Sequence, residues 1–238
     1  MNKVYLYDNY YHLINLILEL LKNNIEPDDI KNNEYIPNLL DEVINLKQDF
    51  NNLNEFKKFD KSIIHACYYT FLSNKENKEM LMYTFLKNAL KYKENVFKYR
   101  NIDEINEVIK TTKYVGGEAH KLKGFLRFKK AQNFYYASYE STNNVLPILA
   151  NHFKNRLATE YWIIKDETRN TYAIYDLKKI TYLKNSSLEL NFVDSEFEDL
   201  WKTFFKTIAI KERKNLKCQM NFMPKKYWSH MLEMENEK

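Results

Sequence analysis

Glycine is scarce in this chain, and its placement is the feature that most constrains the fold. The 238 residues contain three glycines, Gly116, Gly117 and Gly124. A chain this poor in glycine is expected to place it where the backbone needs a positive φ or a close approach. The same window carries five cations between Lys121 and Lys130, with no acid among them. We therefore expect a turn at Gly116 that leads into the functional half of the chain.

Charge is distributed unevenly along the sequence. Residues 1–110 hold 15 Lys and Arg against 17 Asp and Glu, whereas residues 111–238 hold 22 against 15. A basic half is typical of proteins that meet a polyanion. The chain is also rich in Lys, Asn, Ile and Tyr throughout, as AT-rich coding produces, so part of the lysine excess has a compositional explanation.

Cysteine and hydropathy narrow the class of protein. Cys67 and Cys218 stand far apart without the spacing of a zinc site or a disulfide framework, which favours a reducing, cytoplasmic compartment. The longest apolar stretch, residues 13–21, is interrupted by Asn15 and Glu19 and is too short to span a bilayer. We expect a folded protein with no membrane segment and no secretory signal.

The first half is predicted to be mainly helical, over residues 1–113. Residues 4–7 suit a short edge strand, and residues 41–49 suit either a strand or a short helix. Apolar residues then recur at helical spacing in residues 13–21, 63–72 and 80–90, and a short helix is expected over residues 102–111. Stripes of this kind usually form a core.

The pattern changes near residue 114, where an α+β domain over residues 114–238 is expected. Residues 122–130 alternate with period two, and residues 134–139 follow as a second strand of a hairpin. A helix over residues 145–156 begins with Pro147 in its first turn, and residues 161–165 and 171–175 form a second hairpin that residues 177–183 extend. This order predicts an antiparallel sheet with a helix on one face. A capping box at Ser195 then predicts a helix in the final segment.

One face of the first predicted strand is the strongest candidate for a binding surface. Side chains two residues apart on a strand lie about 6.5–7 Å apart, near the phosphate spacing of a single nucleic-acid strand. An aromatic ring among the cations could stack on a base. Alternating lysines equally suit a solvated sheet face or a protected edge strand. The residues of this face are Lys121, Lys123, Phe125, Arg127 and Lys129.

A second basic cluster lies near the C-terminus and is a candidate second wall of the same groove. A charge run on a terminal helix is also commonly just solvated. The candidate nucleic-acid-binding residues of this cluster are Lys202, Lys206, Arg213, Lys214, Lys225 and Lys226.

Catalytic candidates are few. Glu118 and His120 would lie at the mouth of the glycine turn, where they could act as an acid–base pair because histidine titrates near neutrality. His152, beside Phe153, is the third candidate, although a lone histidine on an amphipathic helix is more often a structural residue. The glycine window lacks the spacing of a phosphate-binding loop, and the chain carries no HExxH, GxSxG or deaminase motif and no CxxxCxxC triad. We expect neither a cofactor nor a metal.

Several segments carry a resemblance to a known family. They are EAHKLKGFLRF at 118–128, VLPILANHF at 145–153, LWKTFFKTI at 200–208, ERKN at 212–215 and MPKKYW at 223–228. Two further segments, VYLYD at 4–8 and DEV at 41–43, extend the likeness to the first half of the chain. Together they resemble the bacterial family called probable DNA metabolism proteins, whose shared region has been treated as a domain of unknown function.

The resemblance implies a role in DNA repair or modification. Members of that family are encoded beside a putative DNA-repair radical SAM protein, and in some relatives the later domain is joined to a uracil-DNA glycosylase-like domain. We expect no glycosylase domain within these 238 residues. The positions that match the family motifs are Glu118, His120, Lys123, Arg127, His152, Lys202, Arg213, Lys225 and Trp228.

Three functional hypotheses follow. The first is a nucleic-acid-associated accessory protein, with DNA as the expected ligand and a radical SAM or glycosylase-type protein as partner. The second is an enzyme that acts on nucleic acid through Glu118, His120 or His152. The third is a protein-interaction module whose basic face binds an acidic partner. Loss of all nucleic-acid binding at low salt would contradict the first of them.

Overall fold

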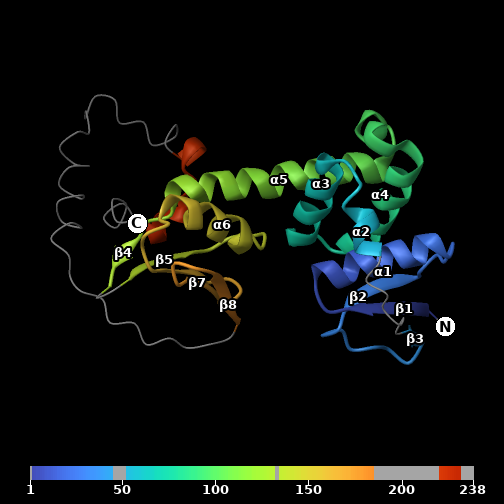
Figure 1. The fold of residues 1–238 in the computed structure, drawn as a ribbon, viewed down its shortest axis with the longest axis horizontal. Helices are drawn as coiled ribbons and strands as arrows, with labels where there is room; N and C mark the ends of the chain where they lie inside the picture. Colours follow the sequence, from blue (N-terminus) through green and yellow to red (C-terminus); the bar gives the residue numbers. More distant parts are fainter. Residues whose placement is uncertain (1, 45–51, 132–133, 185–219, 232–238) are drawn as a thin grey trace. The chain divides into compact units, whose positions relative to one another are not determined.

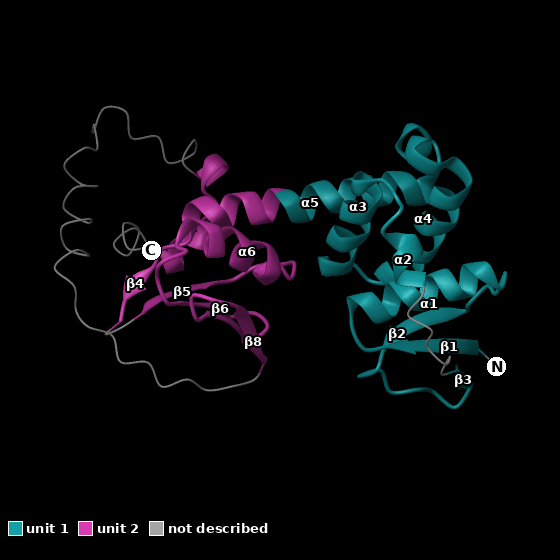
Figure 2. Ribbon diagram, in the orientation of Figure 1, with its two compact units in different colours: residues 1–116 teal, residues 117–238 magenta. Residues whose placement is uncertain are grey.

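The fold combines helices with two separate sheets. The computed structural model describes residues 2–44, 52–131, 134–184 and 220–231 (Figure 1). Helix accounts for 51% and strand for 20% of the described residues, so the α+β class predicted from the sequence is confirmed. The chain divides into two compact units, residues 1–116 and residues 117–238 (Figure 2). The predicted helix that follows Ser195 lies outside the described residues.

Unit 1 contains a three-stranded parallel sheet of β1 (Asn2–Tyr7), β2 (Asp29–Asn32) and β3 (Asp41–Ile44). The strand order is β2-β1-β3, so β1 lies in the middle and the expected edge strand at residues 4–7 is a central one. The crossover between β1 and β2 is helix α1 (Tyr10–Lys22), as parallel neighbours require. The side chain of Asn9 caps α1 by accepting a hydrogen bond from the His12 N–H.

The helices of unit 1 share one apolar core with this sheet. They are α2 (Asn52–Phe56), α3 (Lys61–Leu72), α4 (Lys78–Tyr92) and the 3-10 helix η1 (Lys93–Lys98). The apolar side of α1, represented by Leu13 and Ile17, packs in the same cluster as Ile63 of α3 and Phe85 of α4. These side chains are almost completely buried, so the helical stripes of the sequence do form a core.

Helix α5 (Asp103–Phe125) is the largest departure from the sequence prediction. Residues 102–111 were expected to form a short helix, followed by a turn and a strand over residues 122–130. The helix instead continues through Gly116, Gly117 and Gly124, and none of them has a positive φ. Its continuation is explained by four buried apolar residues at helical spacing, Val115, Ala119, Leu122 and Leu126. The boundary between the two units falls within this helix, after Gly116.

Unit 2 contains a mixed five-stranded sheet with the order β4-β5-β6-β7-β8. Its strands are β4 (Lys129–Lys130), β5 (Tyr135–Tyr139), β6 (Trp162–Asp166), β7 (Thr171–Tyr175) and β8 (Ile180–Lys184). The predicted second hairpin is confirmed, because β6 and β7 are antiparallel neighbours and β8 extends them. The all-antiparallel sheet is wrong, because β5 and β6 are parallel.

Helix α6 (Leu146–Arg156) forms the crossover between β5 and β6 and packs against β6 and β7. A strand, a helix and a second strand joined in this order form a βαβ unit, which explains why the pair is parallel. Alternate residues of β6, including Trp162 and Ile164, are buried together with Leu149 and Phe153 of α6. The 3-10 helix η3 (Lys225–His230) contacts β5 and completes the described part of unit 2.

The helical placement of the glycines generates a prediction about stability. Gly117 lies inside α5, and a Cβ added there meets no atom within 4 Å. Because alanine favours a helix interior over glycine, Gly117→Ala should raise the free energy of unfolding by about 0.5–1 kcal/mol. A turn with positive φ would give the opposite sign. All three tryptophans of the chain lie in residues 117–238, so urea unfolding followed by their fluorescence measures the effect.

Gly116→Ala is the matched comparison. Its added Cβ would lie 3.4 Å from the ring of Tyr69, at the short limit of ordinary van der Waals contact, so the gain should be no larger than at Gly117. Equal destabilisation by both substitutions would show that the backbone is not helical at this point.

Candidate functional site

The carboxyl ends of the parallel strands β5 and β6 carry a buried polar network. In open sheets with parallel strands, ligand sites and polar loops concentrate at these ends. Strand β5 ends at Tyr139 and is followed by the loop of residues 140–145, and β6 ends at Asp166 and is followed by the turn of residues 167–170. Glu118 of α5 binds this loop, and Lys226 of η3 binds Glu118.

Glu118 is the centre of the first half of the network. One carboxylate oxygen, Oε1, accepts hydrogen bonds from the Thr142 N–H at 3.0 Å and from the Lys226 ammonium at 2.9 Å. The other, Oε2, accepts from the backbone N–H of Asn143 at 2.9 Å and from its side-chain amide at 2.7 Å. The side chain is only 5% exposed. A buried carboxylate with this many donors fixes the loop in one conformation.

The pKa of Glu118 is set by two opposing effects. Burial favours the neutral form and raises the pKa, whereas the bonds from Thr142, Asn143 and Lys226 favour the charged form. The donors prevail, so the pKa lies below its ordinary value and Glu118 is ionised at neutral pH. The geometry therefore gives Glu118 a positioning role for the loop of residues 140–145.

Asp166 is the centre of the second half. Its Oδ2 accepts from the Arg169 guanidinium at 3.0 Å and from the Tyr139 hydroxyl at 3.3 Å. Complete burial raises the pKa of Asp166, and the neighbouring Arg169 partly offsets this. The same guanidinium donates to the carbonyl oxygens of Ser141 and Thr142. Arg169 thus binds the loop from the β6 side as Glu118 does from the α5 side.

The predicted pair of Glu118 and His120 does not form. Both residues lie on α5, and residues two apart on a helix project in different directions. Glu118 is buried in the network, whereas His120 is exposed. The glycine turn that would have brought them together is a segment of helix.

The predicted cationic strand face is also wrong. Lys121, Lys123 and Phe125 lie on α5, and only Lys129 lies on a strand, β4. Phe125 packs in a cluster with Trp228 and has its ring centroid 5.5 Å from that of Tyr227, so it is partly buried against η3. Arg127 follows the helix and donates to the Gly124 carbonyl at 2.8 Å.

His152 has cationic neighbours from two helices. His152 and Arg156 are separated by one turn of α6 and share a face, and Lys123 of α5 lies within electrostatic reach of the imidazole. Burial lowers the pKa of His152, and Lys123 and Arg156 lower it further. No ion pair joins Lys123 or Arg156 to an Asp or Glu among the described residues. We call Lys123, His152 and Arg156 the basic cluster.

The second predicted wall is described only in part. Lys202, Lys206, Arg213 and Lys214 lie outside the described residues. Lys225 and Lys226 lie on η3, where the Lys225 ammonium is 5.6 Å from the centroid of the Trp228 ring. Lys226 is an internal partner of Glu118.

Among the residues of the network that escaped the sequence prediction are Thr142, Asn143, Asp166 and Arg169. A signal for Asp166 was available, because it continues the buried alternation of Trp162 and Ile164 at the end of a strand. The other three contribute backbone groups or long-range contacts that no spacing reveals. In the ranges that the structure covers, no group of three or more His, Cys, Asp or Glu residues could hold a metal ion. The helices of these ranges also lack the length and apolar character needed to cross a membrane.

The Glu118 network generates a prediction about stability. Glu118→Gln replaces one of the two acceptor oxygens with an amide NH₂ group, which is a donor and would face the donors that bind Glu118. The substitution should therefore lower the free energy of unfolding at pH 7 by about 2–3 kcal/mol. Because the folded pKa of Glu118 is lowered, its stabilisation is present above the unfolded value, about 4.3. It is lost as the pH falls through the folded pKa. The difference between wild type and variant should therefore shrink below about pH 4.

Urea unfolding of both proteins, followed by tryptophan fluorescence from pH 3 to 7, measures this effect. The matched control is Glu140→Gln, which removes an exposed carboxylate in the same loop and should change the stability by less than about 0.5 kcal/mol. A loss of equal size in both variants, or one independent of pH, would contradict the role of Glu118.

Comparison with known proteins places the chain in a family. The family model described as a domain of unknown function, DUF4130, matches residues 76–233. No curated protein and no solved structure matches. The matched region runs from the start of α4 through η3 and includes the Glu118 network and the basic cluster. The chain therefore belongs to the DUF4130 family.

Proposed function

We propose that this chain is a nucleic-acid-associated accessory protein of DNA repair or modification, and that unit 2 carries the contact. The observation that supports this best is the basic cluster. Lys123 of α5 and Arg156 of α6 are basic side chains that both act electrostatically on the imidazole of His152. Backbone phosphates are the anions that Lys and Arg side chains on a protein surface bind in nucleic acids.

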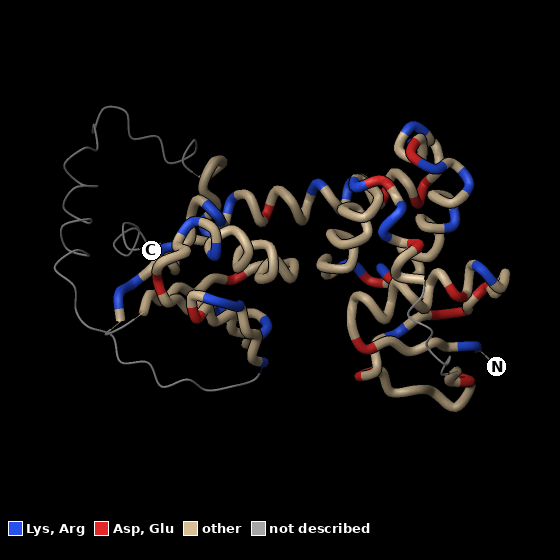
Figure 3. Tube along the Cα trace, in the orientation of Figure 1, with Lys and Arg blue, Asp and Glu red and all other residues tan. Residues whose placement is uncertain are grey.

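The surroundings of the cluster strengthen this proposal. The segment that follows α5 is joined to α6 by the rings of Phe128 and Phe153, whose centroids are 4.9 Å apart. Further Lys residues of unit 2 lie at the end of α5 and on β4 (Figure 3). A polyanion that crosses the cluster would therefore meet additional positive charge along its path.

An accessory role fits the carboxylates of unit 2 that are buried. Glu118 and Asp166 are occupied by donors from the surrounding loop and by Lys226 and Arg169. These two buried carboxylates hold the loop in place, and the side chains that remain available to bind nucleic acid are those on the surface. On the family resemblance, the partner that performs the chemistry is a radical SAM protein or a glycosylase-type protein in the cytoplasm.

The proposal predicts salt-dependent binding of DNA. If about five phosphates are neutralised, log K should fall against log salt with a slope of roughly −3.5 for single strands and −4.5 for duplex. The double variant Lys123→Glu/Arg156→Glu should weaken binding at least about tenfold at 0.1 M salt and flatten the slope by about two. Fluorescence anisotropy of a labelled oligonucleotide measures both quantities.

The matched control is Lys98→Glu/Arg100→Glu, which makes the same change of charge at two exposed residues of unit 1. It should reduce the affinity by much less than the unit 2 variant. Equal loss in the two variants would mean that net charge alone governs binding, and no binding by the wild type at low salt would remove the proposal.

The basic cluster also predicts a response of His152 to DNA. In the free protein its pKa lies below the ordinary value because of burial and of Lys123 and Arg156. A phosphate in the cluster favours the charged imidazole, so saturating DNA should raise this pKa, and binding should tighten as the pH falls through it. The His152 ring resonances followed by NMR over pH 5–8, with and without DNA, measure the shift. The exposed His120 serves as internal reference, and an unchanged His152 pKa would place the DNA elsewhere.

A further inference from the structure

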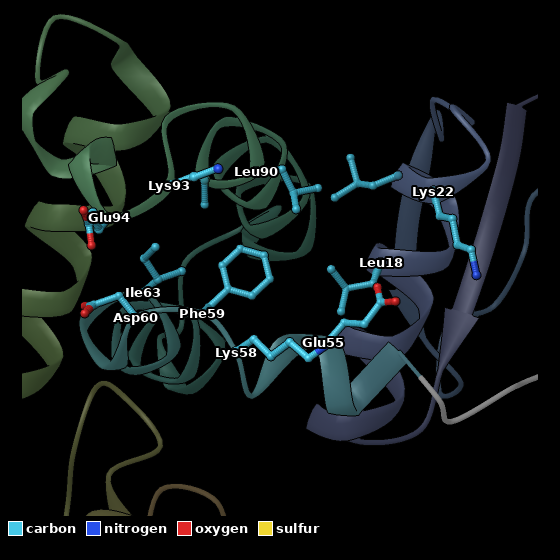
Figure 4. Close-up of a pocket in the computed structure, with 12 residues that line it drawn as sticks. Leu18, Lys22, Glu55, Lys58, Phe59, Asp60, Ile63, Leu90, Lys93 and Glu94 are labelled. Carbon is cyan, nitrogen blue, oxygen red and sulfur yellow. The ribbon is translucent and has the colours of Figure 1, made fainter.

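Unit 1 contains a cavity of about 840 Å³ between α1, α3 and α4. This volume lies in the range of pockets that bind small molecules. Six of its twelve lining residues are apolar, namely Leu18, Leu21, Phe59, Ile63, Ala89 and Leu90, and the other six are charged, namely Lys22, Glu55, Lys58, Asp60, Lys93 and Glu94. Phe59 projects into the space between Ile63 and Leu18 (Figure 4). Leu90 is 49% exposed, which is high for a leucine beside a core.

The charges around this cavity are arranged asymmetrically. Lys93 lies at the rim next to Leu90 with its ammonium on the cavity side, and Glu55 lies across the cavity beside Leu18 (Figure 4). The carboxylates of Asp60 and Glu94 point away from the cavity (Figure 4). Asp60 is in addition the N-cap of α3, where it accepts the Ser62 N–H at 2.8 Å. Among the three charged residues at this end, Lys93 is therefore the one whose charged group faces the cavity.

Lys93 is held at this rim by an unfavourable backbone conformation. Its φ is 51° and its ψ is −136°, at the position that ends α4. Glycine is the residue that this conformation and the end of a helix favour, because a Cβ is strained there. Strained backbone that a protein retains is concentrated at functional sites. Lys93 thus combines a strained backbone with a long cationic side chain at the rim of the cavity.

We infer that this cavity binds a small amphipathic anion, with an apolar body among Phe59, Ile63 and Leu90 and an anionic head at Lys93. This is a second site, in unit 1, and it does not rest on the proposed contact of unit 2 with nucleic acid. The ammonium of Lys93 would supply the polar contact that orients an otherwise apolar ligand in the cavity.

The test uses 8-anilinonaphthalene-1-sulfonate, an aromatic sulfonate that fluoresces in apolar sites. Titration of the full-length folded chain should show saturable binding with one site per chain. Decanoate and 2-naphthoate, which share the anionic head and differ in the body, are then added as competitors. Displacement by either supports the inference and identifies the body as aliphatic or aromatic. Failure of both to displace the probe, or absence of saturable binding, overturns it.

Three substitutions separate the charge from the strain. Lys93→Gly removes both, so it should raise the unfolding midpoint by roughly 2–4 °C and weaken the probe about five- to tenfold. Lys93→Met keeps the strain and the length of the side chain but removes the charge, so only the affinity should fall. Asn77→Gly is the matched control: Asn77 precedes the same helix with φ 53°, and the substitution relaxes this backbone but removes the acceptor of the Lys31 ammonium at 3.3 Å, so the midpoint should change little and the affinity should stay at the wild-type level.

Wild-type affinity in both Lys93 variants would overturn the assignment of the anionic head. Since Lys93→Gly is expected to stabilise the chain, loss of binding in that variant cannot come from unfolding. DNA binding by the same variants should remain at the wild-type level, which keeps this test distinct from that of unit 2.

Discussion

The ionised carboxylate of Glu118 is the interaction on which the described part of unit 2 depends. It joins three segments that are distant in sequence: α5, the loop before α6, and η3. Its donors are two backbone N–H groups, an amide and an ammonium, so it satisfies polar groups that the fold would otherwise bury without partners. Because a buried charge is tolerated only with full pairing, this network defines one arrangement of the loop rather than several.

The sequence predicted the α+β class, the helix over residues 145–156 and the hairpin of β6 and β7, because each has a clear period and its own turn chemistry. It failed at α5. Residues 122–128 alternate in hydrophobicity, and the glycine pair at Gly116 and Gly117 suggested a turn, yet Val115, Ala119, Leu122 and Leu126 also fit a helix. Burial of that stripe outweighed the intrinsic cost of glycine, about 1 kcal/mol for each. The parallel pair of β5 and β6 was missed although the intervening helix implies it.

The sequence identified individual residues of the candidate site but not the contacts between them. Glu118, Lys123, Lys226 and His152 were identified from charge and motif, but their relationships were not, because these depend on which helix face each occupies. Glu118 and His120 are neighbours in sequence and belong to different surroundings, one buried and one exposed. Conversely, Glu118 and Lys226 are 108 residues apart and form a hydrogen bond of 2.9 Å. No local pattern encodes a contact of that range.

The region matched by the DUF4130 model and the two compact units have different boundaries. The DUF4130 match begins at residue 76, so α4 and the first part of α5 belong to the family region while packing in the core of unit 1. In unit 2, the buried carboxylates of Glu118 and Asp166 form ion pairs with Lys226 and Arg169. Acids consumed in this way are not available to the exposed cations. Since Lys123 and Arg156 have no acidic partner among the described residues, the internal network itself contributes to the basic character of the surface that we propose for nucleic acid.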